Sequence, residues 1–576
     1  MFNRYYESEL RHLRTLSREF SQAYPALAPM LASNSSDPDV ERLLEGVAFL
    51  TGLTRQKLED DFPEFTQELM WILMPHYLRG IPASTMVQFA PRNALREAIT
   101  VKKGTELGAK PIDGTSCRFS TTEDLYVHPI ALTSVGFANQ TGMAESLVLS
   151  FKNMGADFHA FAQHPLQLFV NAGWTEATQI FQMLTTLVSK VVIHANGKVV
   201  SVLPAKAVQA SGVHYGVLPY PGNAFPAYRL LQEYFAIPEK FLFLEVQGLE
   251  QMLGLAVTQF DIEFVLSQRP DWLPEVHNQS ILLNVVPALN LFRQGAVPVT
   301  LNHRSTEYEI RPDGNNAQHY QTYSIDSVQG FLPGAAQVKP YLPFGVQQRN
   351  PSQHKGPEAG IYHTHVRSAL VDGTPQTFIT IPYEASETVV QQTLSISLTC
   401  TNSRLADELK YGDVCMATSS TPEQLVFKNI VPVRPAQDTA SAHSQQWKLL
   451  THISMNLLSQ ASVAHLHSLL SLYVPADKHG HTARAHRQRI EGIESMTVSP
   501  ESRLVGRHMM RGQVIHLTCR SDHFAGVADL YLFGVVMDRF FAAYASMNAY
   551  TRLELKDSIT QEVFRWSPRL GLQELL

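Results

Sequence analysis

The spacing of apolar residues changes near Ser84, and this change constrains the fold more than any other feature of the chain. Before it, apolar residues such as Tyr6, Leu10 and Leu13 recur every three or four positions, which is typical of a helix facing a core. After it, they alternate in short runs bounded by turn-forming residues, as in 86–90, which is typical of half-buried strands. The sequence therefore predicts a helical segment followed by β-rich regions.

The helical segment carries an apolar stripe that its own small size covers poorly. Asp37 and Pro38 supply an N-cap and a first helical position, and a stripe follows at helical spacing. The stripe consists of Val40, Leu43, Leu44, Val47 and Leu50. Together with Tyr6, Leu10 and Leu13, it is predicted to contact a partner subunit. Packing of these helices on their own domain fits the same periodicity and stays open.

The chain is too long for one hydrophobic core, because single cores stop growing near roughly 250 to 300 residues and this chain has 576. We predict an α+β, multidomain fold with exposed loops at 347–360 and 433–446, and with C-terminal helices near 457–472 and 530–545. The predicted regions are a helical segment (1–82), a β-rich middle region (83–310), a second β-rich region with exposed loops (311–445) and a mixed α/β region (446–576).

Charge and cysteine content exclude several classes of protein. The formal net charge is −6 with no long run of either sign, so a nucleic-acid partner is not expected. Charged residues make up 17% of the chain, against roughly 25% in average proteins, and a large core, a β-rich architecture or surface that becomes interface would each produce this deficit. The four cysteines are isolated, and neither a signal peptide nor a membrane-spanning run is visible. A cytoplasmic location without membrane insertion is predicted.

Motifs that carry chemistry are missing. The sequence has no glycine-rich phosphate loop, no His-Glu-x-x-His and no Gly-x-Ser-x-Gly, so we predict no cofactor, no metal and no catalytic residue. His479, His481 and His486 are flanked by Lys and Arg without a Cys or carboxylate, and they are interpreted as part of a solvated loop. The acidic pairs at 60–61 and 123–124 are expected to face solvent.

Several separated runs resemble one protein family. The longest begins Asp37-Pro-Asp-Val-Glu-Arg-Leu-Leu-Glu-Gly-Val and continues to Met74-Pro-His-Tyr-Leu78. The others are 228–244, 400–404, 447–456, 530–534, 538–548 and 566–569, in the order of the family. This pattern resembles TssF, the baseplate subunit of type VI secretion systems, also called the VasA or ImpG family.

The resemblance implies a structural protein similar to the wedge proteins of contractile phage tail baseplates. It implies that two copies of the chain associate with one TssG, that TssE and TssK join this wedge, and that six wedges surround the VgrG spike. It also implies assembly at the cytoplasmic face of the inner membrane through partners. An alternative from another class is a β-rich carbohydrate-active enzyme or a lectin-like binding module, for which a cleft with two carboxylates would be needed.

Overall fold

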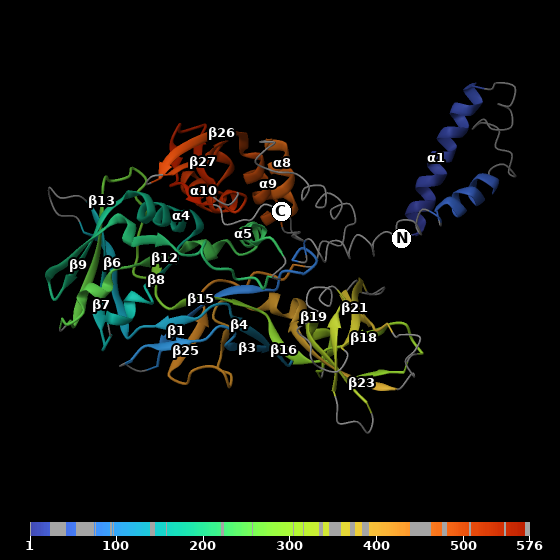
Figure 1. The fold of residues 1–576 in the computed structure, drawn as a ribbon, viewed down its shortest axis with the longest axis horizontal. Coiled ribbons are helices and arrows are strands. Elements are labelled where there is room, and N and C mark those ends of the chain that lie inside the picture. The colour runs from blue at the N-terminus through green and yellow to red at the C-terminus, as the bar shows by residue number, and fades with distance from the viewer. Residues whose placement is uncertain are drawn as a thin grey trace. The chain divides into compact units, whose positions relative to one another are not determined.

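The structure of the chain is a computed structural model, shown in Figure 1. The structure describes residues 2–23, 42–52, 54, 74, 76–92, 95, 97–138, 145–156, 158–220, 224–255, 257–302, 304–314, 316–332, 338–344, 359–368, 375–382, 391–437, 462–474, 481–505, 508–545 and 549–570. It divides into two compact units, Met1–Leu78 with Ala440–Thr451, and Arg79–Thr439 with His452–Leu576. The predicted boundaries near 83, 311 and 446 stay predictions.

The first unit is helical where it is described. Helix α1 spans Phe2–Ala23, and a second helical segment covers residues 42–52. In the second segment Ala48 is fully buried and Leu44 is half-buried, one helical turn apart. The buried face of this segment is therefore the line through 44 and 48. Residues 63–73 of the predicted helical segment lie outside the described residues.

The second unit begins with an antiparallel sheet that joins distant parts of the sequence. The sheet order is β24, β3, β4, β15, β1 and β25, so strands from 84–121 pair with strands from 285–289 and 414–429. The bounds are Ser84–Pro91 (β1), Glu106–Ile112 (β3), Thr115–Thr121 (β4), Val285–Leu289 (β15), Val414–Met416 (β24) and Leu425–Asn429 (β25). Val87, Phe119 and Val286 belong to its buried core.

Two smaller sheets and a short strand pair follow between residues 99 and 282. One sheet has the order β10, β9, β13, β7, β6, and the other β11, β12, β8, β14. The bounds are Ile99–Val101 (β2), Leu125–Val127 (β5), Ile130–Ala138 (β6), Ser146–Asn153 (β7), Leu166–Val170 (β8), Val188–Ala195 (β9), Lys198–Pro204 (β10), Val208–Ala210 (β11), Phe243–Val246 (β12), Gln259–Leu266 (β13) and Ile281–Leu282 (β14). Helices α4 (Trp174–Gln182) and α5 (Pro226–Ala236) lie between these strands in the sequence.

A further sheet occupies residues 292–401. Its order is β16, β23, β19, β20, β21, β22, β18, with β17 paired to β23. The bounds are Phe292–Gly295 (β16), Val299–Leu301 (β17), Tyr308–Ile310 (β18), Gln321–Phe331 (β19), Val338–Pro343 (β20), Gly360–Ser368 (β21), Pro375–Thr380 (β22) and Gln392–Thr401 (β23). Leu394, Leu398 and Ile379 are fully buried in it.

Two buried amides join this sheet to the first one. Asn290 and Asn402 are both 0% exposed, and the Asn290 Nδ2 amide donates to Asn402 Oδ1 at 2.9 Å. The backbone N–H of Asn402 donates to Asn290 Oδ1 at 2.7 Å, and that of Arg118 in β4 donates to Asn402 Oδ1 at 2.9 Å. Because buried amides need every partner they have, this pair fixes how β4 and β23 approach each other.

The last region is mixed α/β, as predicted. Strands β27 (His508–Cys519) and β28 (Ala549–Asp557) are parallel, and helix α10 (Val527–Ala542) connects them and packs on β28. Strand β26 (Ile493–Val505) forms a hairpin with β27, while β29 (Val563–Arg565) and β30 (Arg569–Leu570) pair with β28. Helices α8 (Val463–Leu472) and α9 (His481–Glu491) pack against β26. Figure 1 shows these elements in orange to red.

Two predicted loops differ in outcome. Most of 347–360 lies outside the described residues. The prediction of an exposed loop is wrong for 433–437, where Arg434 pairs with Ser84 and Gln437 with Ile81, and where Val433 is buried. Residues 433–437 therefore run alongside the start of β1 and do not project into solvent as a loop. The rest of the predicted loop, 438–446, lies outside the described residues.

The end of the chain closes over α10. The Trp566 ring stacks on Tyr531 of α10 with ring centroids 5.6 Å apart, and Arg569 forms an ion pair with the buried carboxylate of Asp538. Gly534, one turn from Tyr531, makes this packing possible, since a Cβ atom there would lie 2.4 Å from Cη2 of Trp566. Three of the runs that carry the family resemblance thus meet at one place.

We expect Gly534→Ala to destabilise the second unit by about 1 to 3 kcal/mol, because the half-buried indole of Trp566, which packs directly on this turn of α10, would have to shift. Differential scanning fluorimetry should show a midpoint lowered by roughly 2 °C or more. Gly136→Ala in β6 is the matched control, since nothing lies within 4 Å of a Cβ atom there. Equal midpoints for the two variants would contradict this account of Gly534.

Candidate functional site

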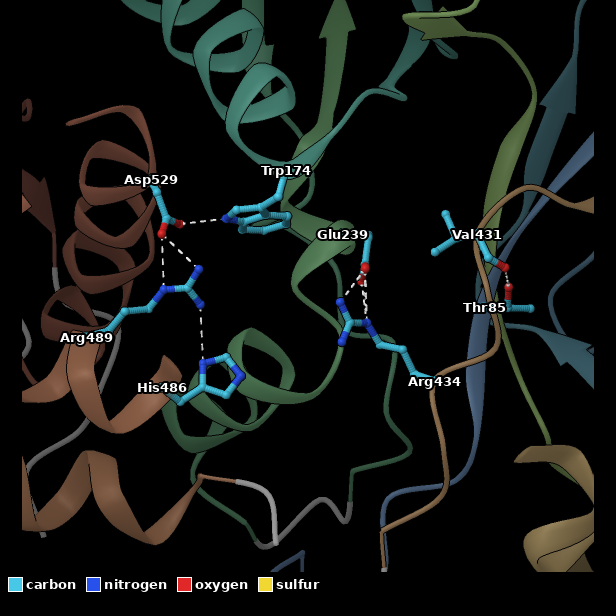
Figure 2. Close-up of polar contacts among 8 residues, drawn as sticks. All are labelled: Thr85, Trp174, Glu239, Val431, Arg434, His486, Arg489 and Asp529. Carbon is cyan, nitrogen blue, oxygen red and sulfur yellow. Dashed lines mark hydrogen bonds and ion pairs between the residues drawn. The ribbon is translucent and has the colours of Figure 1, made fainter. Parts of the chain in front are cut away.

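A cavity of about 580 Å³ opens where four segments of the second unit meet. The segments are the end of β8 with the start of α4, the 3₁₀ turn Pro238–Leu242, the stretch after β25, and α9. The lining side chains used below are Trp174, Glu239, Val431, Arg434, His486 and Arg489. Figure 2 shows the ion pairs and hydrogen bonds that these residues form with one another, with Asp529 and with Thr85.

The carboxylate of Asp529 is the centre of the first set of contacts. It is 0% exposed in the first turn of α10, where the Trp174 indole donates to Oδ1 at 3.1 Å. Arg489 donates to Oδ2 through Nε at 3.1 Å and through Nη2 at 2.8 Å, and the backbone N–H of Ala525 adds a bond at 3.0 Å. The helix N-terminus also favours a negative charge there. One carboxylate therefore ties α4, α9 and α10 together.

His486 extends this network. The interpretation of its surroundings as a solvated loop is wrong at this residue. It lies in helix α9, only 3% exposed, because its position faces Phe235 of α5 with ring centroids 5.0 Å apart. Its Nδ1 accepts from Nη1 of Arg489 at 3.3 Å. Burial, assisted by the charges of Arg489 and Arg434, lowers the pKa of His486 to about 3. The imidazole is thus a neutral acceptor at neutral pH.

Arg434 and Glu239 form the second set of contacts. Arg434 Nε lies 3.0 and 2.8 Å from the two carboxylate oxygens of Glu239, and Nη2 also bonds Oε1. The backbone of Arg434 pairs with Ser84, and Thr85 donates its hydroxyl to the carbonyl of Val431 at 2.7 Å. Since β1 contains Ser84 and Thr85, these contacts fasten the first sheet to the 3₁₀ turn before β12 (Figure 2).

This arrangement suits holding segments together better than chemistry. Each arginine at the cavity is already paired with a carboxylate, so neither carboxylate is placed as a free acid or base. In the described ranges, no group of three His, Cys, Asp or Glu residues is placed to hold a metal ion. His479 and the side chain of His481 lie outside those ranges. Every described helix is too short or too polar to cross a lipid bilayer.

The acidic pair at 123–124 is only partly where it was expected. Asp124 is exposed and accepts from the backbone N–H of Lys103 at 2.7 Å. Glu123 is half-buried with its Oε1 atom shielded from solvent, which corrects the prediction, and this burial raises the pKa of its carboxyl to about 7. The pair at 60–61 lies outside the described residues.

The structure places the candidate interface residues on two helices of the first unit. Tyr6, Leu10 and Leu13 of α1 are half-buried, as is Leu44. Leu43, Val47 and Leu50 are exposed by 68%, 43% and 65%, on a side of the helical segment away from Ala48. Val40 lies outside the described residues. The stripe therefore divides into a covered line and an uncovered apolar line.

Sequence reasoning missed the acids of three ion pairs, two beside the cavity and one, Asp538 with Arg569, under the end of the chain. Asp529 borders and Asp538 interrupts the apolar run of α10, and single acids in such a run are a signal for buried ion pairs. Glu239 lies inside the run 228–244 that carries the family resemblance. Their partners Arg434, Arg489 and Arg569 gave no local signal, because the contacts join residues far apart in the sequence.

Comparison with known proteins identifies the family. The family described as "Type VI secretion system, TssF" matches residues 1–573. The type VI secretion system component TssF1 of Pseudomonas aeruginosa (strain PAO1) is 28% identical over 626 aligned positions, which cover 98% of each chain.

Solved structures agree with this. A chain in the cryo-electron microscopy structure of the type VI secretion system TssK-TssF-TssG baseplate subcomplex superposes with a TM-score of 0.78 at 28% identity, over 93% of this chain and 99% of that one. A chain of the type VI secretion baseplate complex, 23% identical with a TM-score of 0.62, covers 99% and 100% and supports the fold. These matches place the chain among the proteins of the type VI secretion machine. It belongs to the TssF family, whose members are baseplate components.

The burial of His486 predicts acid sensitivity. Its folded pKa of about 3 lies below the ordinary 6.5, so as the pH falls from 6.5 towards 3 only the unfolded chain takes up this proton. Stability is therefore lost in that window, by up to about 1.4 kcal/mol per pH unit for this one group. In urea unfolding between pH 6 and 4, His486→Leu should show a shallower pH dependence than the parent chain.

The control is His277→Leu, whose side chain is 78% exposed and should leave the pH dependence unchanged. Identical slopes for the parent chain and His486→Leu would show that the neutral buried imidazole makes no contribution to acid unfolding.

Proposed function

We propose that this chain is a structural wedge subunit of the type VI secretion baseplate and that it performs no chemistry. The observation that carries the proposal is the match to TssF proteins over nearly the whole chain, in sequence and in fold. The ion-paired arginines at the cavity favour the structural function over a carbohydrate-active enzyme, which needs carboxylates free to act as acid and base.

The proposed partners are TssG and TssK, the proteins named with TssF in the similar subcomplex. From the family resemblance we further propose two copies of this chain for each TssG, with contacts to TssE and to the VgrG spike. The wedge would assemble in the cytoplasm, at the face of the inner membrane, through its partners. Interaction with nucleic acid has no support, since the net charge is −6.

Co-expression with TssG tests this proposal. We expect a complex with two copies of this chain per TssG by native mass spectrometry, and a chain that oligomerises or aggregates when expressed alone, because its exposed apolar residues lack their partner. A monodisperse chain that ignores TssG at micromolar concentration would overturn the proposed function.

The uncovered line Leu43, Val47 and Leu50 is the proposed TssG contact. Each of Leu43→Asp and Val47→Asp would bury a carboxylate without a partner on assembly, which should weaken the complex by roughly a hundredfold or more. Because both side chains are exposed in the chain itself, the thermal midpoint should stay unchanged. Pull-down with tagged TssG measures the first effect, and scanning fluorimetry the second.

Glu45→Lys is the control on the same exposed helical segment and should reduce recovery much less. If the Asp variants lowered the thermal midpoint, the stripe would be core of its own unit. If they assembled normally, the line would not be the contact.

A further inference from the structure

The connection between β4 and β5 carries an inward-facing acid on a firm support. The backbone N–H and the hydroxyl of Thr122 both donate to the carbonyl of Pro287 in β15, at 3.1 and 3.0 Å. On the other side, the carboxylate of Asp124 accepts from the backbone N–H of Lys103 at 2.7 Å. Glu123 lies between these two anchors, with its Oε1 atom shielded from solvent. The first sheet therefore fixes the place from which this carboxyl points inward.

A buried ion pair lies next to this acid. Lys240 and Glu233 are both 0% exposed, and the Lys240 ammonium bonds to Oε2 of Glu233. The other carboxylate oxygen of Glu233 accepts from the backbone N–H groups of Val217 and Leu218, at 2.7 and 2.8 Å. The ammonium also lies over the Tyr215 ring, 5.4 Å from its centroid. The two charges of the pair thus balance each other without the acid of the β4–β5 connection.

Two acids therefore share one buried cation. The carboxyl of Glu123 lies beside Gln167 and Tyr215 and within reach of the charge of Lys240. Because Glu233 already balances Lys240, an ionised Glu123 leaves a net negative charge in a site that is largely shielded from water. A proton on Glu123 makes the cluster neutral. The arrangement of the charges thus favours the protonated acid as long as the cluster is closed.

The surrounding groups reduce this preference without removing it. Gln167, Tyr215 and Lys240 favour the ionised carboxyl, and Lys103 does so from the exposed surface. Burial opposes them and has the largest effect, so the pKa of Glu123 rises from 4.5 to about 7. A carboxyl that turned out into water would regain its ordinary pKa. The closed connection therefore holds the proton more tightly than an open one would.

We propose that residues 122–124 form a proton-dependent clasp, which closes over Tyr215 and Lys240 while Glu123 carries a proton and opens more readily when Glu123 is ionised. The clasp joins the first sheet to β8 and to the 3₁₀ turn before β12. Acid tightens it, whereas acid destabilises the surroundings of His486. The proposal does not depend on the proposed function, because every contact that it uses lies within this chain.

The expected response follows from the two pKa values. While the open form is ionised and the closed form is protonated, the ratio of open to closed clasp rises about tenfold for each pH unit. With a pKa of about 7 in the closed form and 4.5 in the open form, the ratio rises roughly tenfold between pH 6 and pH 8. Most of this rise occurs below about pH 7.5, above which both forms are ionised.

Hydrogen–deuterium exchange tests the clasp in the full chain, alone or in the complex recovered with TssG. Peptides that cover residues 120–127 are compared at pH 6, 7 and 8, after correction for the intrinsic pH dependence of amide exchange. In the parent chain we expect opening to rise by about tenfold over this range. In Glu123→Gln, which is neutral and similar in shape, opening should stay near the parent's value at pH 6. Equal thermal midpoints of the two chains at pH 6 check that the variant is folded.

Asp124→Asn is the matched control, because this neighbouring acid is exposed and an amide oxygen can still accept from Lys103. It should respond to pH as the parent does. Tyr215→Phe removes a hydroxyl that favours the ionised carboxyl, so its rise should continue to higher pH. The same pH dependence in the parent and in Glu123→Gln would overturn the proposal. Slower exchange of the parent at pH 8 than at pH 6 would also overturn it, because the ionised carboxyl would then hold the connection closed.

Discussion

The buried carboxylate of Asp529 is the contact on which the arrangement of the second unit depends. It has no exposure to water, and its bonds come from Trp174 at the start of α4, Arg489 in α9 and the backbone before α10. A buried charge that loses its partner costs about 3 to 5 kcal/mol, so each of these elements must keep its place for the others to stay. The βαβ unit of the C-terminal region is thereby held to the middle of the chain.

The other junctions follow the same principle. Glu239 and Arg434 fasten the first sheet to the turn before β12, and Asn290 with Asn402 fastens it to the sheet of residues 292–401. Apolar contacts tolerate sliding, whereas paired charges and amides are satisfied in few geometries. The regions of the second unit are therefore fixed in angle as well as in distance.

The sequence allowed the fold class to be predicted, because periods of 3.6 and 2 are local properties. The helix at the N-terminus, strands such as β7 and β13, and the C-terminal helices α8 and α10 follow from such patterns. The polar junctions could not be predicted, since Asp529 and Trp174 meet across 355 positions. His486 was misjudged for a related reason: its charged neighbours indicate solvent, but α9 turns this one position towards Phe235.

The buried ion pairs at these junctions add to the effect of the low charge content of the chain, because they remove further charges from its surface. Three acids of the second unit, Asp529, Asp538 and Glu239, form ion pairs with arginines inside the unit. These charges are therefore not available on the surface, where they would oppose association with other proteins. Apolar side chains remain exposed on helical residues 42–52 and, in the other unit, at Leu504 and Met509. Rigid junctions and uncovered apolar surfaces complement each other, because a docking surface is selective only when the body that presents it holds its geometry. The chain thus uses several of its charges to fix internal geometry, while large apolar side chains stay exposed on both units.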